Sequence, residues 1–387
     1  MNINKIDKRL LEKIAVLNSE RKIPCFVFSK DFKRTKQVLK EKGIHILDEY
    51  LFINSLFCKA SQKEILNLSN VKVVDYIASL SVVNSLMYVS KRILSLDALN
   101  LYGEGIGVAF IDTGVTPHCD FLIGQNRICE FVDFVNGKQQ EYDDNGHGTF
   151  VCGVCSGSGC LSNFRYSGIA PKTNIFALKA LDGKGEASAN KILDAMQWVY
   201  ENHKEKNIKV VCMSFGSEPL GKSDPIMLGA EALWNEGVVV VAAAGNSGPE
   251  YQTIKSPGIS SKIITVGGID DNRYDSKSFN RKYFEIADFS SRGPAFRHVK
   301  PDIVAPSVDI ISCGIKNPYT ILSGTSVATP MVAGICCLLL EKYHDYSPNK
   351  IKTLLLKSCQ PMGFEMNSEG YGIPNMKLEK KVIQRRL

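Results

Sequence analysis

The pattern of hydrophobic and polar residues divides the chain into a short N-terminal region and a long remainder. Between residues 23 and 77, short apolar runs alternate with two charged amphipathic segments, Asp31 to Lys42 and Ser61 to Leu68. We expect both segments to be helices, the first capped by Asp31. The apolar runs predict three strands, Ile23 to Phe28, Ile44 to Leu56 and Val71 to Ile77. Together these elements indicate a small α+β domain.

The remainder of the chain alternates longer apolar runs with helical stretches. Runs such as Gly237 to Ala242 are apolar throughout, which is typical of parallel strands that helices cover on both faces. The fold class predicted is therefore α/β, a doubly wound, mostly parallel sheet sandwiched by helices and preceded by the small α+β domain. The expected strands are Val108 to Ile111, Ile175 to Leu181, Val210 to Phe215, Val238 to Ala244 and Ile263 to Val266, and the expected helices follow His147 or span Ala189 to Lys204 and Leu228 to Asn235.

Four parts follow from this division. Residues 1–22 form a charged N-terminal arm, residues 23–85 the α+β domain with its junction, residues 86–376 the large α/β domain, and residues 377–387 a basic C-terminal tail. The junction, Ser79 to Ile93, contains neither glycine nor proline. We expect part of it, Ser81 to Leu86, to be extended.

Charge is unevenly distributed. The net charge of +7 equals the charge of residues 1–43, and residues 377–387 add +4, which leaves −4 for residues 44–376. The basic ends lack interleaved aromatic residues, so nucleic-acid binding is not favoured. A mildly acidic body and a basic N-terminal segment permit electrostatic docking between the two.

The cysteines and the N-terminus bear on the compartment. Several of the twelve cysteines lie inside apolar runs, so we expect reduced thiols, and for the CxxC pair Cys152 and Cys155 packing is the better interpretation than a metal or redox role. The first residues do not form a secretory signal, and we find no apolar window long enough for a membrane span. The expectation is a cytoplasmic protein.

One stretch, Leu322 to Gly334, combines a tight small-residue turn with the start of a helix. Ser326 lies in that turn, where the positive end of the helix would stabilise an oxyanion, and we expect Pro330 to occupy the first helical turn. Ser326 is therefore a candidate nucleophile, although a plain helix N-cap explains the turn equally well.

A serine nucleophile needs a histidine base and a carboxylate that orients the base. His147 lies in the glycine-flanked motif Asp143 to Thr149, and Asp112 ends an apolar strand in Asp112-Thr113-Gly114. Ligands gather at the carboxyl ends of strands in open α/β sheets, so Asp112 is well placed.

The motifs Asp112-Thr113-Gly114, His147-Gly148-Thr149 and Gly324 to Pro330 resemble, in this order, those of the subtilisin-like serine proteases. The resemblance covers roughly residues 86–376 and is strongest to the intracellular branch of the family, despite Phe150 and Val327 at positions where histidine and methionine are usual. It implies a serine endopeptidase that cleaves protein or peptide substrates through an acyl-enzyme, with Asp112, His147 and Ser326 as the catalytic triad.

The resemblance also implies an oxyanion hole and a substrate cleft. Asn246, which follows the strand Val238 to Ala244, would supply the oxyanion-hole amide, and an ordinary turn is the alternative. The segments that would bind substrate are Gly183-Lys184-Gly185, Ser214-Phe215-Gly216 and Ala243-Ala244-Gly245, with Lys255 at the floor of the specificity pocket. Lys255 either presents a charge to the substrate or, as we favour, lays its methylenes along the pocket and extends its charge to solvent.

The N-terminal domain resembles in position a propeptide that assists folding and then inhibits. The enzyme would then be an autoprocessed or self-inhibited zymogen with its own N-terminal domain as a partner, and the alternative is a protease-shaped regulatory protein kept silent by that domain. No cofactor is required and no metal ligand is predicted. Calcium is allowed but not favoured, because Asp120 matches a family ligand while the loop Gly157 to Ser167 lacks the usual asparagines.

Overall fold

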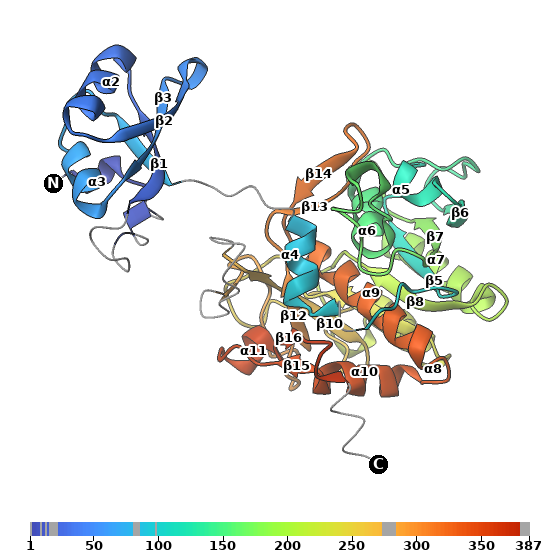
Figure 1. Cartoon of the computed structure of the whole chain (residues 1–387). Coiled ribbons are helices and arrows are strands. Elements are labelled where there is room, and N and C mark those ends of the chain that lie inside the picture. Colours follow the sequence, from blue (N-terminus) through green and yellow to red (C-terminus); the bar gives the residue numbers. More distant parts are fainter. Residues whose placement is uncertain are drawn as a thin grey trace. The chain divides into compact units, whose positions relative to one another are not determined.

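Two units with separate hydrophobic cores make up the computed structural model, Met1–Val83 and Asn84–Leu387 (Figure 1). The structure describes residues 2–7, 10–11, 14, 22–79, 86–96, 99–272 and 284–379. Each unit is described by itself below.

The N-terminal unit is a four-stranded antiparallel sheet with strand order β2-β3-β1-β4 and two helices. Both helices begin at polar caps, since Asp31 accepts a hydrogen bond from the Arg34 backbone and Ser61 forms a capping box with Glu64. The elements are η1 (Ile3–Lys5), β1 (Ile23–Phe28), α2 (Phe32–Glu41), β2 (His45–Tyr50), η2 (Leu51–Ile53), β3 (Ser55–Ala60), α3 (Gln62–Leu68) and β4 (Tyr76–Ser79).

Three details differ from the sequence prediction. The run Ile44 to Leu56 is two strands and not one, because the chain turns through η2 and a left-handed Asn54 before β3 begins. The last strand begins at Tyr76 and not at Val71. Ile6, Leu10 and Ile14 of the predicted arm are buried in the core of this unit, so the described part of the arm belongs to it.

Residues 80–85 of the predicted junction lie outside the described residues. The last part of the junction forms the helix α4 (Leu86–Ile93), so the extended conformation predicted for Leu86 is wrong. Helix-forming residues and the absence of glycine and proline explain the difference.

The second unit is built on a twisted sheet with strand order β11-β10-β9-β8-β5-β7-β6, and β12 pairs with β10. All neighbours in this sheet are parallel except the pair β10 and β11, which confirms the doubly wound α/β fold. The strands are β5 (Gly107–Asp112), β6 (Ile128–Asp133), β7 (Asn174–Lys179), β8 (Ile208–Met213), β9 (Val239–Ala243), β10 (Ile264–Asp270), β11 (Glu285–Ile286) and β12 (Ile303–Pro306).

The order of the strands determines where a ligand site is expected. The chain adds β6 and β7 on one side of β5 and then β8, β9 and β10 on the other, so the carboxyl end of β5 is a switch point where ligands collect. Every residue of β5 and β9 is buried, because helices cover both faces of the sheet.

Helices α6 and α9 pack against each other and on the sheet, and α7 packs with α8 (Figure 1). The remaining elements of this unit are α5 (Cys119–Leu122), α6 (His147–Ser156), η4 (Cys160–Ser162), α7 (Ala189–Asn202), η5 (Gly221–Ser223), α8 (Pro225–Asn235), β13 (Ile310–Cys313), β14 (Tyr319–Leu322), α9 (Thr325–Lys342), α10 (Pro348–Lys357), β15 (Cys359–Gln360), α11 (Met366–Glu369) and β16 (Ile373–Pro374).

Helix α9 meets the length and composition of a membrane span, which the sequence reading did not anticipate. In the fold 83% of this helix is buried, and a core helix of an α/β unit passes the same test. The beginning of the predicted basic tail is anchored to the end of this helix, because the buried Glu379 accepts hydrogen bonds from Lys342 and Tyr343. Residues 380–387 lie outside the described part.

Candidate active site

Asp112 and His147 meet at the carboxyl end of β5. The His147 Nδ1 atom lies 2.8 Å from Asp112 Oδ1, and the same oxygen accepts a hydrogen bond from the Thr113 backbone at 2.7 Å. Asp112 is buried, while the side chain of His147 is 25% exposed. This pairing fixes the imidazole with Nδ1 bound to the carboxylate, so Nε2 is the nitrogen left for a reacting group.

Asp143 holds the loop that carries His147. This residue was named from the sequence only as the start of the His147 motif. The buried Asp143 carboxylate accepts hydrogen bonds from the backbone of Gly146 and Thr149 and from the hydroxyl of Thr113. Burial raises the pKa of Asp143, but these hydrogen bonds outweigh it and hold the pKa below its usual value. A charged carboxylate therefore fixes the first turn of α6.

Glycine is required where α6 begins, because two backbones cross there. A Cβ atom on Gly148 would lie 2.2 Å from the Gly114 carbonyl oxygen. The Gly148 N–H donates to the Thr113 hydroxyl at 2.8 Å, so the loop after β5 and the first turn of α6 form one network. This close approach brings His147 within reach of Asp112.

The pKa of His147 lies above that of a free histidine. Burial lowers this pKa, but the negative charge of Asp112, the hydrogen bond to it and the charge of Asp143 together raise it by more. The same charges stabilise an imidazolium, the form that a histidine base takes after it accepts a proton.

Ser326 lies in the first turn of α9, half-buried, directly after the turn at Gly324. Asn246 follows β9, and its Oδ1 accepts hydrogen bonds from the backbone and hydroxyl of Thr325, both at 2.9 Å. A methyl group on Gly324 would lie 3.1 Å from Ser326 Oγ and 3.3 Å from Asn246 Nδ2. The hydroxyl and the amide donor therefore face the same small space.

The prediction for Pro330 is wrong in position. It is the sixth residue of α9 and lies inside the helix, not in the first turn. Because proline has no N–H, the Ser326 carbonyl has no bond from the residue four positions later. The free backbone donors of the first turn, which include the Ser326 N–H, do not depend on this proline.

A cavity of about 250 Å³ opens beside Ser326. Of the predicted substrate segments it includes Ser214, Phe215, Gly216, Ala243, Gly245 and Lys255, and its other lining residues are Asn246, Ser247, Thr325 and Ser326. The predicted Ala244 does not line it, since its side chain is fully buried in a small apolar cluster with Ile254 and Ile259.

Lys255 fills the space between the two walls of this cavity. A Cβ atom on Gly216 would lie 2.6 Å from Lys255 Cβ, and one on Gly245 would lie 2.5 Å from Lys255 Cγ. The ammonium group forms an ion pair with Glu218, whose side chain is 81% exposed, while that of Lys255 is 18% exposed. The methylenes thus line the pocket and the charge is paired at its rim.

The segment Gly183-Lys184-Gly185 lies beside the His147 loop and does not line this cavity. The Gly183 carbonyl accepts a hydrogen bond from Asn145 at 3.1 Å, and Asp182 holds the turn by accepting from the Lys184 backbone at 2.8 Å. The structure thus brings the segment to the same edge of the sheet, on the histidine side of Ser326.

A buried lysine, Lys179, was missed by sequence reasoning. Its ammonium group donates to the carbonyls of Thr113 and Leu181 and to Asp144 at 2.6 to 3.0 Å, so it ties the ends of β5 and β7 together. A lysine at the end of an apolar strand was the only signal available, because its partners are distant in sequence.

The surroundings of Asp120 do not suit calcium. Calcium requires six to eight oxygen ligands, but the groups around this buried carboxylate are mainly hydrogen-bond donors. The backbone N–H groups of Gly159 and Leu161 and the hydroxyl of Tyr319 all donate to it. A loop that presents N–H groups to a carboxylate cannot present carbonyl oxygens to a cation at the same place.

All twelve cysteines are free thiols. Cys152 and Cys155 lie on α6 with fully buried side chains in the core, where burial raises the pKa of Cys152 well above its usual value. The environment of the CxxC pair is therefore that of packing residues.

Comparison with known proteins agrees with this architecture. Residues 103–373 match the model of the subtilase family. Over 277 residues the chain is 40% identical to serine protease AprX of Bacillus subtilis, an alignment that covers 66% of this chain and 61% of AprX, so this chain spans less than two thirds of that relative.

Two further similarities extend the comparison. The thermostable alkaline protease of Halalkalibacterium halodurans is 28% identical over 355 residues, which cover 90% of each chain and therefore include part of the N-terminal unit. Among solved structures, Sphericase superposes with a TM-score of 0.62 and 26% identity, covering 73% of this chain and 97% of that one.

Proposed function

The chain belongs to the subtilase family of serine endopeptidases, and on that premise we propose that it hydrolyses peptide bonds through an acyl-enzyme with Asp112, His147 and Ser326 as the triad. The observation that carries this proposal is the 2.8 Å pairing of His147 Nδ1 with the buried Asp112, at the sheet edge where the first turn of α9 holds Ser326. Protein or peptide chains are the substrates.

In the proposed reaction His147 Nε2 takes the proton of the Ser326 hydroxyl while its oxygen attacks the scissile carbonyl carbon. The oxyanion accepts hydrogen bonds from Asn246 Nδ2 and the Ser326 N–H. His147 then gives its proton to the leaving amine, and a water molecule, activated by the same histidine, releases the acyl group from Ser326. Asp112 stays ionised and stabilises the imidazolium.

A fluorophosphonate probe tests the nucleophile directly, because it reacts with activated serines. We expect the probe to label the wild-type protein at Ser326 and not to label Ser326→Ala. Equal labelling of both proteins would contradict the proposal, as would labelling of neither after the N-terminal unit has been removed.

We further propose that the N-terminal unit restrains the enzyme as a propeptide domain. Its separate hydrophobic core, its small antiparallel sheet and the +7 charge of residues 1–43 support this role. Purified residues 1–85 should slow peptide hydrolysis by the processed enzyme, more strongly at low salt because salt screens charge docking. No inhibition at micromolar concentration would refute it.

The proposal also covers the calcium requirement and the cellular compartment of the enzyme. Because donors surround Asp120, we expect activity without calcium, so a calcium-selective chelator such as EGTA should leave the initial rate unchanged.

Twelve free thiols favour action in the reducing cytoplasm. Cell fractionation that recovers the protein only outside the cytoplasm would contradict that localisation.

A further inference from the structure

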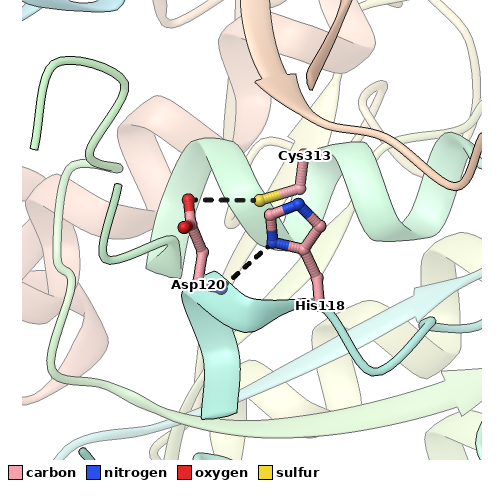
Figure 2. Close-up of side chains that lie close together, drawn as sticks. All are labelled: His118, Asp120 and Cys313. Carbon is pink, nitrogen blue, oxygen red and sulfur yellow. Dashed lines mark hydrogen bonds between the residues drawn. The ribbon is translucent and has the colours of Figure 1, made fainter. Parts of the chain in front are cut away.

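A second cluster of reactive side chains lies away from Ser326, beneath the β13–β14 hairpin. It contains His118 and Asp120 at the start of α5 and Cys313 at the end of β13, all three buried, with their ligand atoms within 4.8 Å of one another (Figure 2). We propose that this cluster binds a zinc ion or a similar borderline-soft divalent cation, a role separate from peptide hydrolysis.

The donor set has the chemistry of a zinc site and not of a calcium site. An imidazole nitrogen, a thiolate and a carboxylate are ordinary zinc ligands. The Cys313 thiol donates to the carboxylate, its Sγ lying 3.7 Å from Asp120 Oδ2. The sulfur atom points at the carboxylate, so a cation that replaces this thiol proton would have three protein ligands and one position open for water.

His118 is held in the tautomer that a metal ligand needs. Its Nε2 lies 2.7 Å from the Pro318 carbonyl oxygen, which can only accept, so Nε2 carries the proton and Nδ1 has the lone pair. Nδ1 faces the cluster and accepts a 3.1 Å hydrogen bond from the Asp120 backbone (Figure 2). A bound cation would take over this lone pair, and the Pro318 contact would remain as the outer hydrogen bond typical of metal-bound histidines.

Groups outside the ligand set hold Asp120 in place. Tyr319 donates its hydroxyl to both carboxylate oxygens at 2.9 and 3.1 Å, and the Gly159 backbone donates at 3.0 Å. The buried guanidinium of Arg127 binds the Asp120 carbonyl. One carboxylate and one thiolate neutralise the two positive charges of the cation.

The ligands of this site come from segments that are far apart in the sequence. Cys313 belongs to the hairpin that leads directly into α9, and His118 and Asp120 belong to the loop and helix after β5. A cation bound only in the folded state would therefore raise the melting temperature with its concentration.

The test uses the full chain carrying Ser326→Ala, which prevents self-digestion and makes the result independent of catalysis. Cobalt(II) is the spectroscopic probe, because thiolate ligation produces a charge-transfer absorption in the near ultraviolet, and zinc is added to displace it. We expect one equivalent of cobalt to bind with that absorption, zinc to displace it, and the melting temperature to rise with zinc. Cys313→Ser should weaken zinc binding at least tenfold, and Cys129→Ser, which alters an exposed thiol outside the cluster, should leave it unchanged.

Several results would overturn the site. These are no charge-transfer band at one equivalent of cobalt, zinc binding that survives Cys313→Ser, or loss of binding in Cys129→Ser. If Cys313→Ser fails to fold, His118→Ala takes its place, with the same expected loss of at least tenfold in zinc affinity. Failure of fluorophosphonate labelling would leave these results unaffected, so the two proposals fail separately.

Discussion

The substitution Glu218→Gln tests whether the charge of Lys255 affects which substrate residue is accepted before the cleaved bond. In the structure the Lys255 ammonium group is paired with Glu218 at the rim of the cavity beside Ser326. The substitution keeps the size of the side chain and removes its charge, so the ammonium group becomes free for a substrate carboxylate. We therefore expect the enzyme to accept glutamate at that substrate position better than the wild type does.

The magnitude follows from the exposure of the pair. Two unit charges about 4 Å apart attract by about 4 kcal/mol at the effective dielectric constant of a protein surface. The side chain of Glu218 is 81% exposed, so solvent screening reduces the value to about 1 kcal/mol. This corresponds to about a fivefold change in the ratio of kcat/KM for a glutamate peptide to kcat/KM for the matching glutamine peptide.

The assay compares these two peptides in wild type, Glu218→Gln and a matched control. Glu104→Gln is that control, since it removes one partner of an exposed ion pair with Lys172 in the same unit, and Glu104 does not line the cavity. The ratio should rise about fivefold only in Glu218→Gln, and the rise should shrink at high salt. An unchanged ratio would show that the ammonium group does not reach the substrate side chain, and that Lys255 acts only through its methylenes.

Two further predictions concern the triad and the oxyanion hole. Because protonated His147 cannot accept the serine proton, kcat/KM should rise with pH through a midpoint above that of a free histidine, and Asp112→Asn should lower this midpoint while reducing the rate about 10⁴-fold. A midpoint that does not move in Asp112→Asn would contradict the electrostatic argument. Thr325→Val removes the hydroxyl that donates to Asn246 Oδ1, so kcat should fall about tenfold, the equivalent of about 1.4 kcal/mol, with KM unchanged; a change in KM alone would instead indicate a role in substrate binding.

Short-range signals in the sequence predicted much of the fold. Strand β1 has the predicted bounds, and α2 begins after its predicted cap Asp31, because one side chain and the next turn of backbone decide such features. Completely apolar runs likewise indicated the parallel sheet, whose buried strands β5 and β9 lie where they were expected.

Features that depend on distant partners were not predictable in this way. Strand β6 has an exposed residue and partly buried ones, and it belongs to the sheet only through its register with β7. Asp143 accepts from the Thr113 hydroxyl 30 residues away, and Lys179 donates to the Thr113 carbonyl 66 residues away, so no local pattern shows these contacts. The helix at Leu86–Ile93 was missed because apolar residues without a clear period fit a strand or a helix equally well.

The triad motifs could be recognised from the sequence alone, because each lies in a short stretch that contains glycines needed for the local backbone conformation. The pairing of Lys255 with Glu218, by contrast, joins two loops, and only their positions in the structure reveal that the charge is compensated. The charge that a substrate meets was therefore the part of the site that sequence reasoning left open.

The central claim is that Asp112, His147 and Ser326 act as one catalytic unit, and a double-substitution experiment tests it most directly. The measurement is kcat/KM on one peptide for Ser326→Ala, His147→Ala and the double variant, each after the N-terminal unit has been removed. Residues that share one proton transfer are not additive, so the double variant should be no slower than either single variant within about threefold. Losses that multiply in the double variant, or substantial activity in Ser326→Ala, would contradict the account.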